Sequence, residues 1–124
     1  MFKDHAAMAM IPAQDLERAS AWYRDKLGLE PAERNEEGLI YRLNGTTVLL
    51  YESRYAGTNK ATMLAFETPN LDADMATLRG KGVQFLDYDL PGFKTENGVA
   101  SMGEMRGAWC NDSEGNILAI SQRS

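Results

Sequence analysis

A repeat within the 124-residue chain is the feature that most constrains its fold. Segment 15–31 ("DLERASAWYRDKLGLEP") resembles segment 70–86 ("NLDADMATLRGKGVQFL") at an offset of 55 residues. Four identities are in register and a fifth follows one gap: Leu16/Leu71, Ala21/Ala76, Arg24/Arg79, Lys26/Lys81 and Gly28/Gly82. Self-similarity at a fixed spacing is typical of duplicated structural modules. We therefore expect one unit of structure to be used twice.

The first half of the chain predicts a strand, a helix and three more strands. Residues 6–11 are an apolar run closed by Pro12, which cannot continue a hydrogen-bonded ladder. Asp15 can cap a helix over 16–27, whose apolar residues recur at helical spacing until Gly28. Three segments rich in leucine, aromatic or β-branched residues follow, with Asn44-Gly45 as a hairpin turn: 29–35, 38–44 and 46–53.

The second half repeats this order. Residues 59–68 predict a strand, and Asn70 can cap a helix that carries Leu71, Met75 and Leu78 inward and ends by Gly80 or Gly82. The three strands expected after it are 83–88, 105–110 and 116–122. We predict an α+β fold, in which residues 1–124 form one domain of two βαβββ modules over about 5–57 and 58–124.

The packing of such modules predicts a small-molecule cleft. One βαβββ unit is a curved sheet with a helix on its outer face, and it cannot cover its own inner face. We therefore expect two inner faces to meet, with paired curved mixed sheets forming an open barrel-like cleft and the helices outside. Alternate residues of several strands would line this cleft.

Composition excludes several classes of partner. The net charge is −5, without a basic run, which gives nucleic acids and anionic membranes little to bind. No apolar run is long enough to span a membrane. The single cysteine, Cys110, cannot form an internal disulfide. We therefore expect a cytoplasmic protein with no nucleic-acid or membrane partner.

Two segments resemble the signatures of the vicinal oxygen chelate superfamily, which includes glyoxalase I, bleomycin resistance proteins, extradiol dioxygenases and fosfomycin resistance enzymes. "IPAQDLERASAWYRDKLGL" (11–29) resembles its first strand and helix, and "AWCNDSEGNILAI" (108–120) resembles its last hairpin. The resemblance implies paired βαβββ modules, a homodimer, and in enzymatic members one divalent metal held by His and Glu side chains.

The resemblance places Met8, Met63 and Ala119 where metal-binding members carry their ligands. A thioether is a soft ligand and a methyl group donates nothing, so this set does not suit the family's metals. The fourth position falls near Leu50, and Glu52, two residues on, shares that strand face, but a single carboxylate does not make a metal site. His5, three residues before Met8, should point to the opposite face, near a fraying terminus. We therefore expect no metal and no cofactor.

The pocket predicted from these positions is apolar. Methionine is flexible and polarisable, which suits an irregular or aromatic ligand, although it is also common core filler. Trp109 offers a flat surface for stacking and one N–H donor, although it could equally be a core residue. Segment 88–104 is long enough to serve as a lid over the site, with Phe93 as its apolar contact. The expected ligand-binding residues are Met8, Tyr41, Leu50, Met63, Ala65, Phe93, Gly107, Trp109, Ala119 and Ser121.

Three functions stay open at this point. The first is a small-molecule-binding protein for a partly aromatic or apolar compound. The second is a lyase or isomerase acting on a small oxygenated substrate, with Glu52 or Glu67 as base or metal ligand. The third is a dimeric interaction module that fills its own cleft. In "DSEGN" (112–116) we interpret the acids as residues of a local turn around Gly115.

Overall fold

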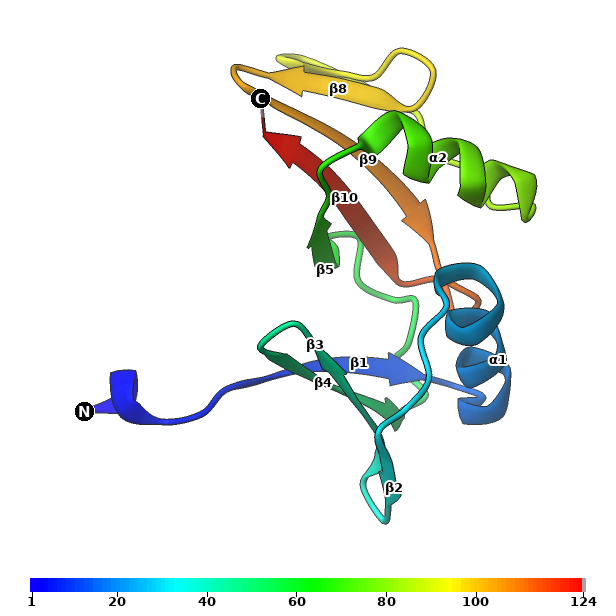
Figure 1. Ribbon diagram of the computed structural model, residues 1–124. Helices are drawn as coiled ribbons and strands as arrows, with labels where there is room; N and C mark the ends of the chain where they lie inside the picture. Colours follow the sequence, from blue (N-terminus) through cyan, green and yellow to red (C-terminus); the bar gives the residue numbers. More distant parts are fainter. Residues whose placement is uncertain (124) are drawn as a thin grey trace.

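The computed structural model describes residues 1–123 and contains two four-stranded mixed sheets (Figure 1). The first sheet has the order β1-β4-β3-β2, in which β1 pairs parallel with β4 and the other pairs are antiparallel. Its strands are β1 (Met8–Ala13), β2 (Glu33–Asn35), β3 (Gly38–Leu43) and β4 (Thr46–Glu52).

The second sheet has the order β5-β10-β9-β8, again with one parallel pair, β5 with β10. Strand for strand this is the order of the first sheet. The repeat in the sequence is therefore a repeat of topology, and the predicted α+β class is confirmed. The strands of this sheet are β5 (Thr62–Glu67), β8 (Val99–Met102), β9 (Met105–Asn111) and β10 (Ile117–Arg123).

Each sheet carries one helix that begins at the expected cap. Helix α1 (Leu16–Leu27) starts where the Asp15 carboxylate accepts the Arg18 N–H at 3.0 Å, and it ends at Gly28 with φ 69°. Helix α2 (Leu71–Gly80) starts where Asn70 accepts the Ala73 N–H at 3.1 Å. In the described chain, residues 1–123, no helix is long and apolar enough to cross a membrane.

Two expected strands differ in the structure. Within segment 29–35, only β2 pairs with the sheet. Segment 83–88 forms no strand and contributes one isolated bridge, Phe85 to Cys110. The predicted loop 88–104 contains β8 and a two-stranded hairpin of β6 (Asp89–Leu90) and β7 (Phe93–Lys94). Strand β8 takes the edge position because a tight turn at Gly103 (φ 61°) joins it directly to β9.

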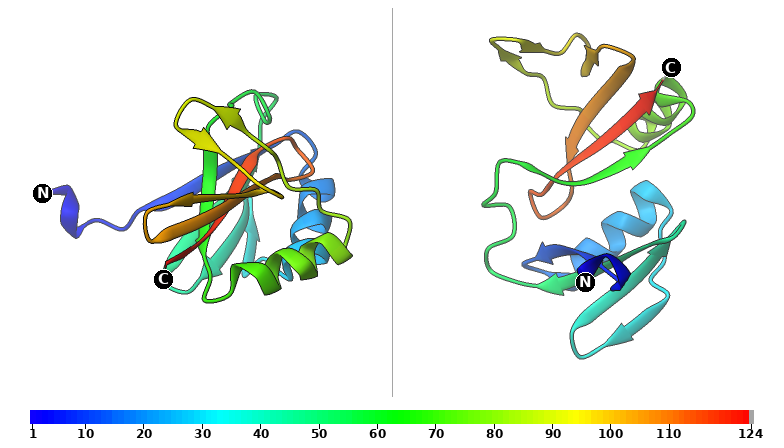
Figure 2. Two further views of the ribbon diagram at one scale, coloured as in Figure 1. Left: turned by 90° about the horizontal axis from the view of Figure 1, so that it is seen from above. Right: turned by 90° about the vertical axis from the view of Figure 1, so that its left-hand side faces the viewer.

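The helix-bearing faces of the two sheets share one core. Both helices lie on the same side in Figure 1, and a short 3-10 helix, η1 (Phe2–Asp4), extends away from the sheets with the N-terminus (Figure 2). The cluster includes side chains from both sheets and both helices: Ile11, Tyr23, Leu39, Tyr41, Val48, Leu50, Leu71, Met75, Ala108, Cys110, Leu118 and Ile120.

The opposite, helix-free faces of the two sheets are open within one chain. On the first sheet this face carries Met8 and Met10, which are 41% and 44% exposed. On the second sheet it carries Ala65, which is exposed, and Trp109, which is half-buried. The two inner faces therefore do not cover each other within a single chain.

Candidate functional site

The helix-free face of the second sheet gathers most of the predicted site residues. Ala119 of β10 lies between Ala65 of β5 and Trp109 of β9 in the strand register. The next row along the same face consists of Glu67, Ser121 and Gly107. Register partners in a sheet share a face, so these six side-chain positions form one surface.

Gly107 makes room for the Trp109 indole. A Cβ built on Gly107 would lie 3.2 Å from the indole Cη2, which is tighter than ordinary side-chain packing, and 3.5 Å from Cζ2. The indole therefore lies along the sheet over a position without a side chain. Gly107 acts by orienting Trp109 rather than by offering a group of its own.

A cluster of three aromatic rings covers one end of this surface. The Phe93 ring centroid lies 5.1 Å from that of Trp109, and Tyr88 lies 5.4 Å from Phe93 and 5.9 Å from Trp109. All three pairs meet edge to face, which is the favoured geometry for aromatic packing. Phe93, the residue expected as the lid contact, thus packs on Trp109. The sequence interpretation missed Tyr88, although its signal was an aromatic residue at the start of the same segment.

Hydrogen bonds at its base hold the β6–β7 hairpin in this position. The Thr95 hydroxyl donates to the Asp87 carboxylate at 2.8 Å and accepts the Tyr88 N–H at 2.8 Å. Asp87 also accepts the Gly98 N–H at 2.9 Å. The hairpin therefore closes on itself, and its contact with the sheet surface is made by aromatic rings.

Met8 lies on a different sheet from Trp109, whereas Met63 lies on β5 of the same sheet, two residues before Ala65. Met8 is on the helix-free face of the first sheet, in register with Thr47. Met63 is half-buried beside the bulge between Ile117 and Leu118, and its sulfur accepts a hydrogen bond from the Asn59 amide at 3.6 Å. One chain thus offers two separate apolar faces.

Tyr41 and Leu50 pack in the shared core, on the other face of the first sheet. Ile11 is in register with Leu50, so Leu50 faces α1 with the buried side chains while Met8 faces away. The Tyr41 ring lies 6.2 Å from the Tyr23 ring of α1. This corrects their expected place beside Met8: alternation along β4 puts Leu49, not Leu50, on the Met8 face.

The two candidate bases lie at exposed strand ends. The Glu67 side chain is 78% exposed and 3.7 Å from the Arg123 guanidinium. Glu52 ends β4 and is also exposed, on the strand face of Leu50. Both carboxylates are exposed to solvent, whereas a carboxylate that acts as a general base is typically desolvated.

Asp112 is buried and joins the last hairpin to the first half of the chain. It accepts the Tyr23 hydroxyl at 2.6 Å and the Asn116 side-chain amide at 2.9 Å. Asn116 in turn donates to the Pro12 carbonyl at 2.8 Å. The expected local turn is present, since the Glu114 and Asn116 N–H groups also donate to Asp112. The contacts with Tyr23 and Pro12 were not foreseen.

Glu114 makes the second inter-sheet connection. Its carboxylate accepts the backbone N–H groups of Gln14 and Asp15, both at 3.0 Å, at the start of α1. The Arg18 guanidinium donates to both carboxylate oxygens at 2.8 and 2.9 Å. These hydrogen bonds, led by that of Arg18, lower the pKa of Glu114 to about 2. Asp112 and Glu114 therefore hold the fold together and point away from the candidate surface.

The donor set does not fit the family's metal. The positions where the resemblance places ligands carry Met8, Met63 and Ala119. Within residues 1–123, no three His, Cys, Asp or Glu side chains gather closely enough to hold an ion. His5 packs against Phe2 in the N-terminal segment, with ring centroids 5.0 Å apart. Cys110 faces the shared core, where burial raises the pKa of its thiol to about 11.

Comparison with solved structures shows the same fold in proteins of several kinds. An antibiotic binding protein, TnmS3, from Streptomyces sp. CB03234 is 23% identical with a TM-score of 0.71, and the match covers 100% of this chain and 99% of that one. The virulence protein STM3117 from Salmonella typhimurium is 17% identical with a TM-score of 0.73 over 100% of both chains. A fosfomycin resistance protein from Listeria monocytogenes, in complex with Mn(II) and 1S,2S-dihydroxypropylphosphonic acid, is 12% identical with a TM-score of 0.68 over 94% and 88%.

A search of curated proteins gave no match. The model of one protein family, described as Glyoxalase/Bleomycin resistance protein/Dioxygenase superfamily, matches residues 4–120. This match covers both sheets, both helices and the last hairpin. The chain belongs to the Glyoxalase/Bleomycin resistance protein/Dioxygenase superfamily.

Proposed function

We propose that this protein binds a small, partly aromatic compound without a metal, on the surface formed by Trp109, Ala119 and Ala65. The observation that carries the proposal is the cluster of Tyr88, Phe93 and Trp109 at one end of an apolar sheet face. Rings that meet edge to face leave faces free for a further planar group. Most of the remaining surface is small and apolar, as in binding pockets for small molecules.

The complete cleft belongs to a homodimer in this proposal. One chain leaves two apolar faces open, that of Met8 and Met10 and that of Trp109. If the first face of one chain covers the second face of its partner, two equivalent clefts form and neither face stays in water. This arrangement supplies Met8 to the ligand surface from the second chain.

The relatives support ligand binding as the function. One structure of the same fold is that of an antibiotic binding protein. The substitution of Met8, Met63 and Ala119 for metal ligands supports binding without metal-assisted chemistry. The exposed positions of Glu52 and Glu67 offer no specific support for the enzyme alternative.

Tryptophan fluorescence tests this proposal because the chain has only two tryptophans. The Trp22→Phe variant leaves Trp109 as the sole reporter, and a panel of polycyclic aromatic compounds is titrated into it. We expect saturable quenching by at least one compound. In isothermal titration calorimetry, the affinity for that compound should be about five- to thirtyfold lower in Trp109→Ala than in Trp22→Phe, since loss of stacking costs about 1–2 kcal/mol.

Metal content is measured on the same preparation, purified without chelators. We expect far less than one metal ion per chain and the same affinity after treatment with a chelator. Stoichiometric metal whose removal abolishes binding would contradict a metal-free site. Equal affinity of Trp109→Ala and Trp22→Phe would show that the compound does not bind at the Trp109 surface.

A further inference from the structure

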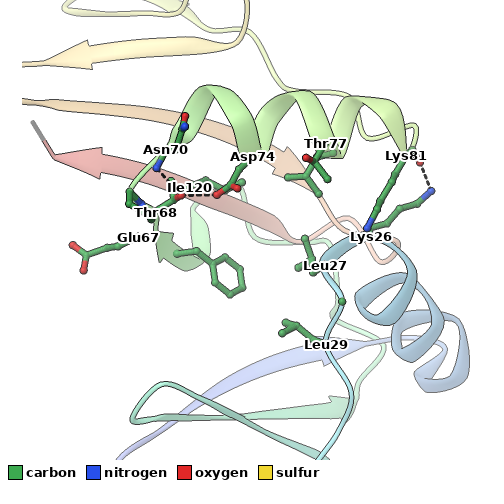
Figure 3. A pocket seen from close by; sticks show the side chains of 14 residues that line it. Lys26, Leu27, Leu29, Glu67, Thr68, Asn70, Asp74, Thr77, Lys81 and Ile120 are labelled. Carbon is green, nitrogen blue, oxygen red and sulfur yellow. Dashed lines mark hydrogen bonds between the residues drawn. The ribbon is translucent and has the colours of Figure 1, made fainter.

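A groove lies on the other side of the second sheet, the side that carries helix α2 (Figure 3). It has a volume of about 520 Å³ and lies between the end of α1, helix α2 and strands β5 and β10. Its apolar lining comes from both halves of the chain: Leu27, Leu29, Phe66, Leu78 and Ile120. Its size is in the range of pockets that hold drug-sized molecules.

Two lysines lie together at one end of this groove. Lys26, near the end of α1, donates a hydrogen bond to the carbonyl of Lys81, which follows α2 (Figure 3). They are equivalent positions of the sequence repeat, so the duplication itself brings two ammonium groups to this place. Among residues 1–123, neither ammonium pairs with a carboxylate.

The acids that line the groove already have partners. Asp74 accepts the Thr68 hydroxyl at 2.5 Å, and Glu67 pairs with Arg123 at 3.7 Å. Figure 3 shows Thr68, Asn70 and Asp74 at the end of the groove away from the lysines. The Lys26 and Lys81 ammonium groups therefore lie at one end of the apolar floor, and the Asp74 carboxylate, which keeps its negative charge, lies toward the other end (Figure 3).

We propose that this groove is a second binding site, for a small amphipathic anion such as a medium-chain or aromatic carboxylate. The anionic group would accept hydrogen bonds from the Lys26 and Lys81 ammonium groups, each of which has N–H donors left. The apolar body would lie on Leu27, Leu78 and Ile120 and remove their exposed surface from water. The site is separate from the Trp109 surface, because β10 presents Ile120 to the groove and Ala119 to the other face.

The probes are decanoate and uncharged decanol, titrated into the full chain with ¹³C-labelled methyl groups. The methyl resonances of Leu27, Leu78 and Ile120 report on the groove, and those of Ala65 and Ala119 report on the Trp109 surface. We expect saturable shifts of the groove methyls, with decanoate binding about fivefold or more tightly than decanol.

Charge variants locate the anionic group. Lys26→Gln with Lys81→Gln should abolish the preference for decanoate over decanol, while Lys60→Gln, outside the groove, should keep it. Lys26→Glu with Lys81→Glu should instead prefer decylammonium. Because these side chains lie at the surface, all variants should keep the folded spectrum.

Several results would overturn the second site. These are shifts confined to Ala65 and Ala119, equal affinity for decanoate and decanol, or the same preference in the double variant as in Lys60→Gln. The readout also separates this proposal from the aromatic ligand site. Failure at the groove leaves the Trp109 fluorescence result unchanged, and failure of Trp109 to bind aromatics leaves the groove shifts unchanged.

Discussion

Glu114 shows how a single buried carboxylate joins two distant parts of the chain. Its side chain is fully buried, whereas that of its partner Arg18 is 54% exposed. The carboxylate therefore depends on fixed donors, the Gln14 and Asp15 N–H groups, as well as on the guanidinium. Removing one partner of a buried charge leaves the other groups without their hydrogen bonds, which strongly destabilises the fold.

Glu114→Gln should lower the free energy of unfolding at pH 7 by about 2 kcal/mol, because the charge-assisted bonds to Arg18 and α1 are lost. The ordinary pKa of 4.5 falls to about 2 on folding, so this stabilisation is complete above about pH 4.5. It is lost as the pH falls through about 2. Urea unfolding of both proteins from pH 7 to pH 2 should show a difference that shrinks only below about pH 4.5.

The control for this prediction is Glu36→Gln, in an exposed turn, which should change stability little at any pH. A difference between the wild type and Glu114→Gln that is independent of pH would show that the charge of Glu114 is not the stabilising element.

Tyr23 and Tyr41 provide a matched pair in the same core. The Tyr23 hydroxyl donates to Asp112 at 2.6 Å, whereas the buried Tyr41 hydroxyl has no hydrogen-bond partner within residues 1–123. Burial raises the pKa of Tyr41, and the nearby Ser20 side chain partly offsets this rise. Tyr23→Phe should lower the free energy of unfolding by about 1–2 kcal/mol, and Tyr41→Phe should leave it unchanged or raise it by up to about 1 kcal/mol. Thermal and urea unfolding measure both. Loss of stability in Tyr41→Phe would show that Ser20 forms a stabilising bond.

At the scale of elements, the β6–β7 hairpin has few ties to the sheet it covers. Its strands are two residues each, and its contact with β9 is made by Phe93 and Tyr88 on Trp109. Elements held by few buried contacts open at low free-energy cost. We propose that the hairpin acts as a lid whose closed position depends on aromatic packing.

Phe93→Ala should increase amide hydrogen exchange in residues 88–95 by about tenfold and weaken aromatic ligand binding by about five- to tenfold, because about 1–1.5 kcal/mol of ring packing is lost. Leu90→Ala is the matched control, since Leu90 is 56% exposed on the same hairpin. Exchange that rises equally in both variants would show that the ring contacts do not hold the hairpin closed.

Most elements were predictable from the sequence because their signals are local. Asp15 and Asn70 mark helix starts, Gly28 marks a helix end, and alternation marks β3, β4, β9 and β10. Strand pairing was less predictable: the segment expected beside β9 was 83–88, whereas β8 pairs with it in the structure. The face of a residue was predictable only where the register was certain, which is why Leu50 and Tyr41 were placed with Met8. The roles of Asp112 and Glu114 depend on partners that lie 89 and 100 residues away in the sequence, Tyr23 and Gln14, which no local pattern encodes.

At the scale of the whole molecule, the core lies on one side of each sheet and the opposite faces are open. Met8, Met10 and Ala65 are exposed on these open faces, while the residues that alternate with them along the strands face the core. Met8 and Met10 on one sheet and Ala65 on the other thus belong to two exposed apolar faces, and we propose that these faces are interaction sites. We propose that a second chain, a ligand or both cover the inner faces.

A dimer formed through these faces should depend on Met8 and Met10. The wild type should have twice the 13.8 kDa chain mass in light scattering at micromolar concentration. Met8→Lys with Met10→Lys should give a folded monomer, because both side chains are already exposed in the single chain and only the interface loses apolar contact. Tyr55→Lys is the control, since Tyr55 is 62% exposed in the segment between the sheets and should leave the dimer intact. A monomeric wild type, or a double variant that stays dimeric, would show that these faces do not pair, and the ligand would then have to bind an open surface of one chain.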